Sequence, residues 1–335
     1  MKSRVVGALM LVTRTPVRVS FCGGGTDLAA FYRANESGGL VTSIALQAHI
    51  YVTINKRFDD SIRVSYSKTE TVDDIEDIQH ELVREAMRLT GVTSGIEINT
   101  IADIPGKGTG LGSSSAVTVG LLHALHAYAG REVGPKQLAE EACEIEISVL
   151  GQTIGKQDQY AAAFGGLNQI SFNSDDTVTV TSLPKLDSTE LANNFCLVWT
   201  GLTRKATPIL EQQSRNTSIK MDELLSMRMQ AEEVSELLSL GDWKSVGSIL
   251  NDAWNLKRTL TEGISNPEID ALYSKLMDLG CGGGKLLGAG GGGFILVQTP
   301  PGVQEKIQDE LTNKVIPLVV DFDGSTIMLD DRDVK

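Results

Sequence analysis

The spacing of apolar residues along the chain predicts a mixture of strands and helices. Short apolar or alternating runs are typical of β-strands, and apolar residues three and four positions apart are typical of helices. Strands are expected at residues 17–21, 48–54, 62–66, 95–100, 168–172, 178–182, 195–200 and 294–297. Helices are expected over residues 72–89 and 116–129, from 135 onward, at 156–164 and over about 209–240, with further helices before the terminal strands. This mixed order predicts an α+β chain.

A polar stretch that contains proline, residues 184–194, separates two groups of these elements. A chain of 335 residues is long for one hydrophobic core, so two domains are expected. We place the division in this stretch. The prediction is an N-terminal domain of residues 1–190 and a C-terminal α+β domain of residues 191–335.

The composition is that of a globular protein with an acidic surface. The formal net charge of −13 argues against a general nucleic-acid binder, because contacts to a phosphate backbone require a basic surface. Four cysteines lie far apart without a C-x-x-C pair, so we expect reduced, packed thiols. No apolar run is long enough to cross a bilayer. We therefore expect a cytoplasmic protein that binds small molecules and no membrane; a homo-oligomer is compatible with the sequence, which carries no signal for it.

The most distinctive stretch is residues 104–116, where glycines recur at every second position before three consecutive serines. These glycines are Gly106, Gly108, Gly110 and Gly112. Glycine lets the backbone turn its N–H groups toward one point, and the helix expected after the serines adds the positive end of its dipole. Such a loop can cradle an anion, most naturally the phosphates of a nucleotide. A capped surface loop is the alternative; three successive hydroxyl groups favour the cradle, because one can cap the helix while the others bind phosphate or magnesium.

Two other nucleotide-binding patterns are excluded. The chain contains no G-x-x-x-x-G-K-[ST] segment, so it has no Walker-type loop. Gly288, Gly290 and Gly293 spell G-x-G-x-x-G, but a strand is expected after them, where a dinucleotide-binding site would have a helix. The four histidines are scattered along the chain, so packed or solvent-facing positions suit them better than metal binding.

Four short motifs follow one another along nearly the whole chain. They are Pro16-x-Arg18 with the segment 23–27, the glycine loop at 108–115, Glu146-x4-Gly151-x3-Gly155-x2-Asp158-Gln159, and the glycine-rich segment 285–293. In this order they resemble the motifs of the GHMP kinases, the superfamily of galacto-, homoserine, mevalonate and phosphomevalonate kinases. The resemblance implies a two-domain α+β fold, with a mixed α/β N-terminal domain like that of some ribosomal proteins and a ferredoxin-like C-terminal domain. It also implies phosphoryl transfer from ATP with Mg²⁺.

The resemblance implies a nucleotide site at the glycine loop. Its residues would be Gly108, Thr109, Gly110, Leu111, Gly112, Ser113, Ser114 and Ser115. Ser114 and Glu146 would hold magnesium, which accepts hard oxygen donors and keeps several waters. A solvated helix residue beside other glutamates is the competing interpretation of Glu146. The later glycines that would pack against this loop, in a structural role or in contact with ligand, are Gly288, Gly290, Gly291 and Gly292.

By the same resemblance, two residues would carry the chemistry. Asp158 would act as general base or orient the acceptor hydroxyl, and Arg18 would stabilise that carboxylate and the transferring phosphoryl group. Taken alone, Asp158 would cap the short helix that follows it, and Arg18 would be a surface residue. The residues implied in acceptor binding are Gly24, Gly25, Thr26, Asp27, Lys156, Arg204 and Lys205. A helix-start role for Asp27 and solvated charge for the cations are the alternatives.

The acceptor is suggested by three segments. Residues 23–27, 155–166 and 200–206 resemble the branch of the family that phosphorylates the anomeric hydroxyl of heptose 7-phosphates, on the route to GDP-heptose for surface polysaccharides. An acceptor that already carries a phosphate needs cations at its far end, for which Lys156, Arg204 and Lys205 are candidates. A free galactose-, fucose- or uronate-like sugar is the alternative acceptor. A non-catalytic sugar or nucleotide sensor is a third interpretation, against which the presence of both acidic residues argues.

Overall fold

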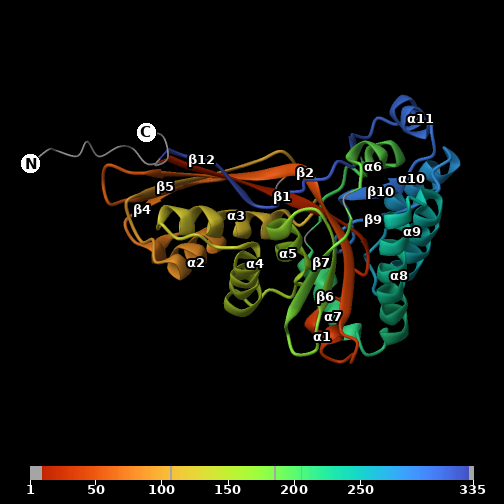
Figure 1. Ribbon diagram of the computed structural model, residues 1–335, viewed down its shortest axis with the longest axis horizontal. Coiled ribbons are helices and arrows are strands. Elements are labelled where there is room, and N and C mark those ends of the chain that lie inside the picture. Colours follow the sequence, from red (N-terminus) through yellow and green to blue (C-terminus); the bar gives the residue numbers. More distant parts are fainter. Residues whose placement is uncertain (1–9, 106–107, 185, 205, 332–335) are drawn as a thin grey trace, which may run out of the picture.

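Two sheets of unequal size form the framework of the molecule (Figure 1). The computed structural model describes residues 10–105, 108–184, 186–204 and 206–331. The larger sheet contains β1 (Met10–Cys22), β2 (Gly39–Lys56), β3 (Ile62–Ser65), β4 (Thr69–Val72), β5 (Ile96–Ala102), β6 (Leu167–Phe172), β7 (Val178–Ser182) and β12 (Thr326–Asp330). Its main path runs β12-β1-β2-β5-β3-β4. Residues 39–44 of β2 pair with β6 and residues 50–56 with β5, so this long strand joins two parts of the sheet.

Helices cover one face of the larger sheet (Figure 1). The helical elements of this half are α1 (Ala29–Tyr32), η1 (Ile75–Asp77), α2 (Glu81–Thr90), α3 (Ser113–Tyr128), α4 (Pro135–Cys143), η2 (Glu144–Val149) and α5 (Gln157–Phe164). At the centre of the layer, α3 packs on β1 and β2 and is flanked by α2, α4 and α5. Because it is enclosed on nearly every side, its sequence has hardly any polar face.

The second half is built around a four-stranded antiparallel sheet in the order β11-β8-β10-β9. Its strands are β8 (Phe195–Trp199), β9 (Gly283–Leu286), β10 (Phe294–Gln298) and β11 (Val315–Pro317). Its helices are α6 (Ser188–Asn194), α7 (Thr207–Asn216), α8 (Met221–Leu240), α9 (Trp243–Arg258), α10 (Pro267–Asp278) and α11 (Val303–Glu310). The fully buried Trp254 of α9 anchors a separate apolar core here. Since α8 also packs on β1, β2 and β6, the two halves share an extensive contact.

The chain crosses between the halves near its C-terminal end. Val320 forms a β-bridge with Leu46, and β12 then pairs antiparallel with β1 of the larger sheet. The predicted division between residues 190 and 191 falls inside α6, one element before the second sheet begins. That division stays a prediction, and the return of the last strand was not foreseen, because a strand's partner some 300 residues away leaves no local pattern.

The helix predicted over residues 72–89 is shorter than the apolar spacing suggested, since α2 begins only at Glu81. Val72 is instead the last residue of β4, and residues 75–77 form the single turn η1. The carboxylate of Glu70 accepts hydrogen bonds from the backbone N–H groups of Gln79 and His80. These bonds satisfy the backbone just before the helix starts. The helix predicted over residues 209–240 is likewise divided, into α7 and α8.

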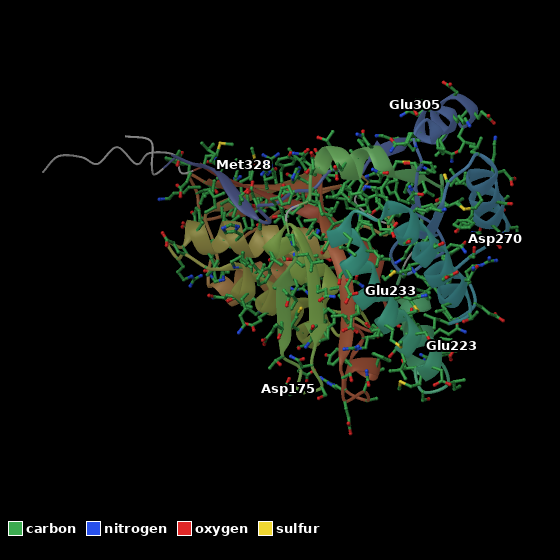
Figure 2. The ribbon with its side chains drawn as sticks, turned by 45° about the vertical axis from the view of Figure 1, so that its right-hand side comes forward. Asp175, Glu223, Glu233, Asp270, Glu305 and Met328 are labelled. Atoms are coloured by element: carbon green, nitrogen blue, oxygen red, sulfur yellow. The ribbon has the colours of Figure 1, made fainter. Side chains whose placement is uncertain are left out.

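The surface carries much of the negative charge behind the net value of −13. Figure 2 shows Glu233 and Glu305 on the outside of the second half and Asp175 at the tip of the β6–β7 hairpin, and all three are exposed. The four cysteines are free and buried, which agrees with the expectation of packed thiols. Burial raises the pKa of the Cys196 thiol to about 12. No helix in the described ranges is long and apolar enough to cross a membrane.

Candidate active site

A cavity of about 790 Å³ is lined by both halves of the molecule. The first half contributes the end of β1 with the turn after it, the glycine loop before α3 and the segment that enters α5. The second half contributes the segment around the start of α7, the end of α9 and the turn between β9 and β10. This volume lies in the range of about 300–1,000 Å³ that is usual for small-molecule sites.

The glycine loop has the backbone conformation of an anion cradle. Gly108, Gly110 and Gly112 have φ of 72°, 76° and 72°, in the left-handed region that favours glycine. Helix α3 starts directly after Gly112 and has no side-chain cap, so its first N–H groups remain available to a ligand. The hydroxyl of Ser113 lies 3.2 Å from that of Thr109 within the loop. The loop therefore offers N–H groups and a helix dipole to phosphate oxygens.

Arg18 connects this loop to the predicted catalytic acid. Its guanidinium donates from Nε to Oδ1 of Asp158 at 2.7 Å, and Nη2 lies 2.7 Å from the same oxygen. Nη1 donates to the carbonyl oxygen of Gly110. Arg18 is only 5% exposed and Asp158 lies inside the first turn of α5 without capping it. The alternative interpretations of Arg18 as a surface residue and of Asp158 as a helix cap are therefore wrong.

The loop and the acid are in direct contact. A Cβ atom placed on Gly112 would lie 3.0 Å from both Cγ and Oδ2 of Asp158. Since Arg18 occupies Oδ1, the second carboxylate oxygen is the one that lies toward the end of the loop. A phosphate held by the loop and a hydroxyl held at Asp158 would meet in this space. Any side chain at position 112 would have to displace the carboxylate.

Glu146 lies behind the start of α3, in the π-helical turn η2. Such turns are frequent at functional sites. Its Oε2 accepts from the hydroxyl of Ser115 at 2.8 Å and from the amide of Gln159. Its Oε1 accepts from Thr118 at 2.9 Å and lies 3.5 Å from the hydroxyl of Ser114. Burial raises the pKa of Glu146, and the hydrogen bonds from these donors oppose that shift. With 0% exposure, Glu146 is not the solvated helix residue of the competing interpretation.

Asp27 is a second buried carboxylate of the cavity, within electrostatic reach of Asp158. Its Oδ1 accepts from the N–H of Gly25 at 2.8 Å, and its Oδ2 accepts from the side-chain amide of Gln157 at 3.0 Å. Burial raises the pKa of this carboxyl group, while the bond from Gly25 lowers it. A Cβ on Gly155 would lie 1.8 Å from Oδ2, so glycine is required there for the carboxylate to fit.

The glycine turn between β9 and β10 packs against the loop. A Cβ on Gly288 would lie 2.4 Å from Cα of Gly110, and one on Gly110 would lie 2.6 Å from the carbonyl oxygen of Leu287. The two backbones thus approach as closely as glycine permits. Gly290 and Gly292 also line the cavity.

The predicted site residues do not all reach the cavity. Most do, and those that line it are Arg18, Gly24, Gly25, Asp27, Gly108, Thr109, Gly110, Gly112, Ser113, Ser114, Ser115, Asp158, Arg204, Gly288, Gly290 and Gly292. Glu146 does not line it and is reached only through the start of α3. Leu111 and Thr26 are 0% exposed; the first packs in the core and the second bonds the carbonyl groups of Gly23 and Leu40. Gly291 packs against the side chain of Arg204. Gly106 and Lys205 lie outside the described residues.

Lys156 has partners away from the cavity. Its ammonium group donates to the carbonyl oxygen of Asp176 at 2.9 Å and lies over the ring of Tyr32, 5.1 Å from its centroid. The carboxylate of Asp176 binds Arg33 as well. The structure therefore places Lys156 in a cluster at the β6–β7 hairpin, whereas Arg204 faces the cavity and donates to the carbonyl oxygen of Gly263.

Several cavity residues were not predicted from the sequence, among them Gln157, Lys257 and Gln213. Gln157 stands inside the fourth-motif segment, between two residues that were singled out, so its place beside Asp158 was the available signal. Its Oε1 atom is buried and has no hydrogen-bond partner among the described residues. Lys257 and Gln213 belong to helices of the second half, and helical spacing alone does not separate a residue that faces a cavity from one that faces a core.

Comparisons with known proteins agree with this geometry. Residues 78–166 match the GHMP kinases N terminal domain, and residues 234–317 match the GHMP kinases C terminal domain. The D-glycero-alpha-D-manno-heptose 7-phosphate kinase of Campylobacter jejuni subsp. jejuni serotype O:2 is 30% identical over 308 residues, which are 86% of this chain and 89% of that protein. An L-fucokinase/L-fucose-1-P guanylyltransferase of Bacteroides fragilis is 26% identical over 89% of this chain, although this chain spans only 36% of that longer protein.

The fold has a close counterpart among solved structures. The crystal structure of a D-glycero-D-manno-heptose 1-phosphate kinase from Bacteriodes thetaiotaomicron superposes with a TM-score of 0.78 at 23% identity, over 95% of this chain and 99% of that one. At that identity the likeness establishes the fold. Together with the matched domains, it confirms the predicted two-domain α+β kinase architecture. Because a relative 30% identical is covered over most of its length and both family domains match, the chain is a sugar kinase that belongs to the GHMP kinases.

Proposed function

We propose that this chain transfers the terminal phosphoryl group of ATP to the anomeric hydroxyl of D-glycero-D-manno-heptose 7-phosphate, forming the 1,7-bisphosphate for GDP-heptose synthesis. The observation that carries the proposal is Arg18, which bonds Asp158 and the carbonyl oxygen of Gly110 at once. A loop suited to phosphates and an acid suited to a hydroxyl thus lie one side chain apart in one cavity. The similarity to the heptose 7-phosphate kinase supports the choice of acceptor.

The residues divide the reaction between them. The N–H groups of the loop and the start of α3 hold the phosphates of ATP and stabilise their charge. The oxygen of the anomeric hydroxyl forms a bond to the γ-phosphorus of ATP, and the bond between that phosphorus and the ADP oxygen breaks. Asp158 accepts the proton that the hydroxyl loses. Arg18 stabilises the carboxylate before the transfer and the charge on the phosphoryl oxygens during it. Both tasks require a planar guanidinium group whose N–H groups bind the loop and Asp158 at the same time.

The chemistry of Glu146 and Ser114 fits magnesium. Mg²⁺ is usually held by one or two carboxylates, its own waters and substrate phosphates. Among the described residues, no group of three or more histidine, cysteine or acidic side chains could bind a metal alone, so the ion would depend on the nucleotide. The buried Glu146 carboxylate and the exposed Ser114 hydroxyl, 3.5 Å apart, would supply the hard oxygen donors at the phosphate loop. When bound, Mg²⁺ would neutralise charge on the phosphate oxygens.

A Glu146→Gln variant tests this metal assignment. The amide has nearly the same shape but lacks the negative charge, so the Mg²⁺ concentration for half-maximal rate should rise by about 10- to 100-fold. The rate is measured against free Mg²⁺ at saturating ATP. Glu141→Gln is the matched control, because Glu141 is a partly buried acid of the neighbouring helix α4 whose partner is His126, away from the cavity. An unchanged Mg²⁺ requirement in Glu146→Gln would remove Glu146 from the proposed metal site.

The acceptor would lie against Asp27 and Gln157. Because the amide nitrogen of Gln157 donates to Asp27, the amide presents Oε1 as its unpaired atom. A buried carbonyl without a donor is costly, and a sugar hydroxyl is a donor of the right kind. Three cations were predicted to bind the phosphate that the acceptor carries. Among the described residues, Arg204 is the one of them that lines the cavity.

A Gln157→Met variant should raise KM for the sugar by about tenfold or more, because Met fills similar space but cannot accept the hydroxyl. KM for ATP should stay unchanged. The specific measurement uses a series of monodeoxy sugars, each lacking one hydroxyl. For the sugar that lacks the hydroxyl bound by Gln157, the drop in kcat/KM relative to the full sugar should be far smaller in the variant than in the parent chain, because the variant does not make that contact. Equal losses for every deoxy sugar in both proteins would contradict the contact.

The decisive test of the proposed function is ADP release with heptose 7-phosphate as acceptor, followed by identification of an anomeric phosphate in the product by phosphorus NMR. Free heptose, L-fucose, galactose and a uronic acid serve as competitors in the same assay. A higher kcat/KM for the 7-phosphate supports the proposal. Equal turnover of free heptose would remove the argument for Arg204, and no ADP release with any sugar would overturn the proposed reaction.

A further inference from the structure

Lys257 is a buried cation whose ammonium group lies beside the cavity. It stands in the last turn of α9 and is 6% exposed. Its Nζ donates to the carbonyl oxygens of Leu286, at 3.2 Å, and of Gly288. The side chain therefore supports the glycine turn from behind and at the same time lines the cavity.

The charge of Lys257 is poorly balanced by the protein. Among the described residues, the groups bonded to Nζ are two neutral carbonyls and no carboxylate. The nearby charged groups are Lys285 and Arg18, which repel the ammonium, and Asp27, which attracts it. Burial, together with the two cations, lowers the pKa of Lys257 well below its ordinary value. A buried cation with neutral partners is unfavourable, so this position would gain most from a bound anion.

The position of the ammonium group indicates which anion fits. An ammonium group has three N–H donors, and the two carbonyls leave one of them. Gly288, which Lys257 holds, is in turn packed against Gly110 of the phosphate loop. The remaining donor thus lies where the glycine turn meets the loop, within the electrostatic reach of Arg18 and Asp27. Phosphate oxygens are the anionic groups that the proposed reaction brings there.

We propose that Lys257 binds a phosphate oxygen of a substrate and that this oxygen supplies the countercharge that the protein lacks. The phosphate is either the terminal group of ATP or the one that the acceptor already carries, and only the second case depends on the proposed heptose substrate. Because the same ammonium holds Gly288, a bound phosphate also strengthens the contact between the glycine turn and the loop.

The test compares Lys257→Met with Lys285→Met. Lys285 is also buried, at 3% exposure, and its ammonium also donates to two carbonyl oxygens, those of Ser20 and Phe21, but it does not line the cavity. Both variants lose a buried ammonium with two carbonyl partners. Only Lys257→Met loses one that can reach a substrate, so a purely structural role predicts the same behaviour for both.

The nucleotide arm needs no acceptor. The dissociation constants of ADP and of a non-hydrolysable ATP analogue are measured by calorimetry with Mg²⁺ present. If Lys257 binds the terminal phosphate, the preference for the analogue over ADP should fall by about 10- to 100-fold in Lys257→Met, the effect expected for losing a charge-assisted hydrogen bond. The same preference should be unchanged in Lys285→Met. Because no sugar is present, this measurement can be interpreted even if the proposed acceptor is wrong.

The acceptor arm compares KM for heptose 7-phosphate with KM for free heptose. If Lys257 binds the acceptor phosphate, the preference for the phosphorylated sugar should fall by about 10- to 100-fold in Lys257→Met and not in Lys285→Met. If neither preference changes in a folded Lys257→Met, or if Lys285→Met changes them equally, the phosphate assignment is overturned and Lys257 only supports the turn. Should Lys257→Met fail to fold, Lys257→Gln, which keeps a donor for one carbonyl, is measured in both arms.

Discussion

An Asp158→Asn variant is expected to have a kcat about 10²- to 10⁴-fold below that of the parent chain, while its affinity for ATP is preserved. Asparagine keeps a side-chain oxygen that can accept from Arg18, so the clamp on the loop survives. What it loses is the carboxylate oxygen that lies toward Gly112 and would take the proton of the acceptor. The rate is measured as ADP release at saturating ATP and sugar, and ATP affinity by calorimetry.

Asp176→Asn is the matched control for this variant. Asp176 is also an aspartate bound to an arginine, Arg33, but it lies at the β6–β7 hairpin away from the cavity. Its turnover should equal that of the parent chain. Circular dichroism checks that both variants fold. If Asp158→Asn turned over as fast as the Asp176→Asn control, Asp158 would not be the base.

Replacing Arg18 with methionine is expected to lower kcat/KM by about 10²- to 10³-fold, because the transferring phosphoryl group loses a preorganised cation and Asp158 loses the partner that orients it. The variant should also be less stable. About 3–5 kcal/mol is the cost of breaking a fully buried pair, and the loss here should be smaller because the Asp158 side chain is 24% exposed. Thermal unfolding gives the stability and ADP release gives the rate.

Arg18→Lys separates charge from geometry. Lysine keeps the positive charge but has no planar fork, so it cannot bind Oδ1 of Asp158 twice and the Gly110 carbonyl at once. Its kcat/KM should lie between those of the methionine variant and the parent chain. A methionine variant as active as the parent would contradict any role of the guanidinium in transfer.

Much of the site was predictable because its main parts are local. The loop at Gly108, Gly110 and Gly112 adopts the left-handed conformations that its glycines suggested. The helix after it was also predicted, although it begins at Ser113, three residues before the predicted start, and no serine caps it. The strand that ends in the Gly23–Gly25 turn and the short helix that carries Asp158 were recognisable for the same reason. Neighbouring residues determine such turns, strands and helices, so they can be predicted from the sequence.

Other parts were predicted incompletely because distant segments decide them. Lys156 and Arg204 were treated alike as cations for the acceptor, yet one lies in a hairpin cluster with Asp176 and the other lines the cavity. Lys257 gave no signal, since a lysine in the last turn of a helix is usually solvated. The long apolar strand β2 was predicted only in part, because residues buried on both faces do not alternate.

By itself, the sequence determined the family, the mixed architecture and the elements that carry the loop and the acids, because glycine conformations and apolar periodicity act over a few residues. The resemblance already paired Arg18 with Asp158, but only the tertiary structure decided that Arg18 also bonds the carbonyl oxygen of Gly110 in the loop, and that α9 brings a buried lysine to the same cavity. The physical reason is that close packing of the two halves brings these groups together, and a contact between distant segments has no periodicity along the chain to reveal it.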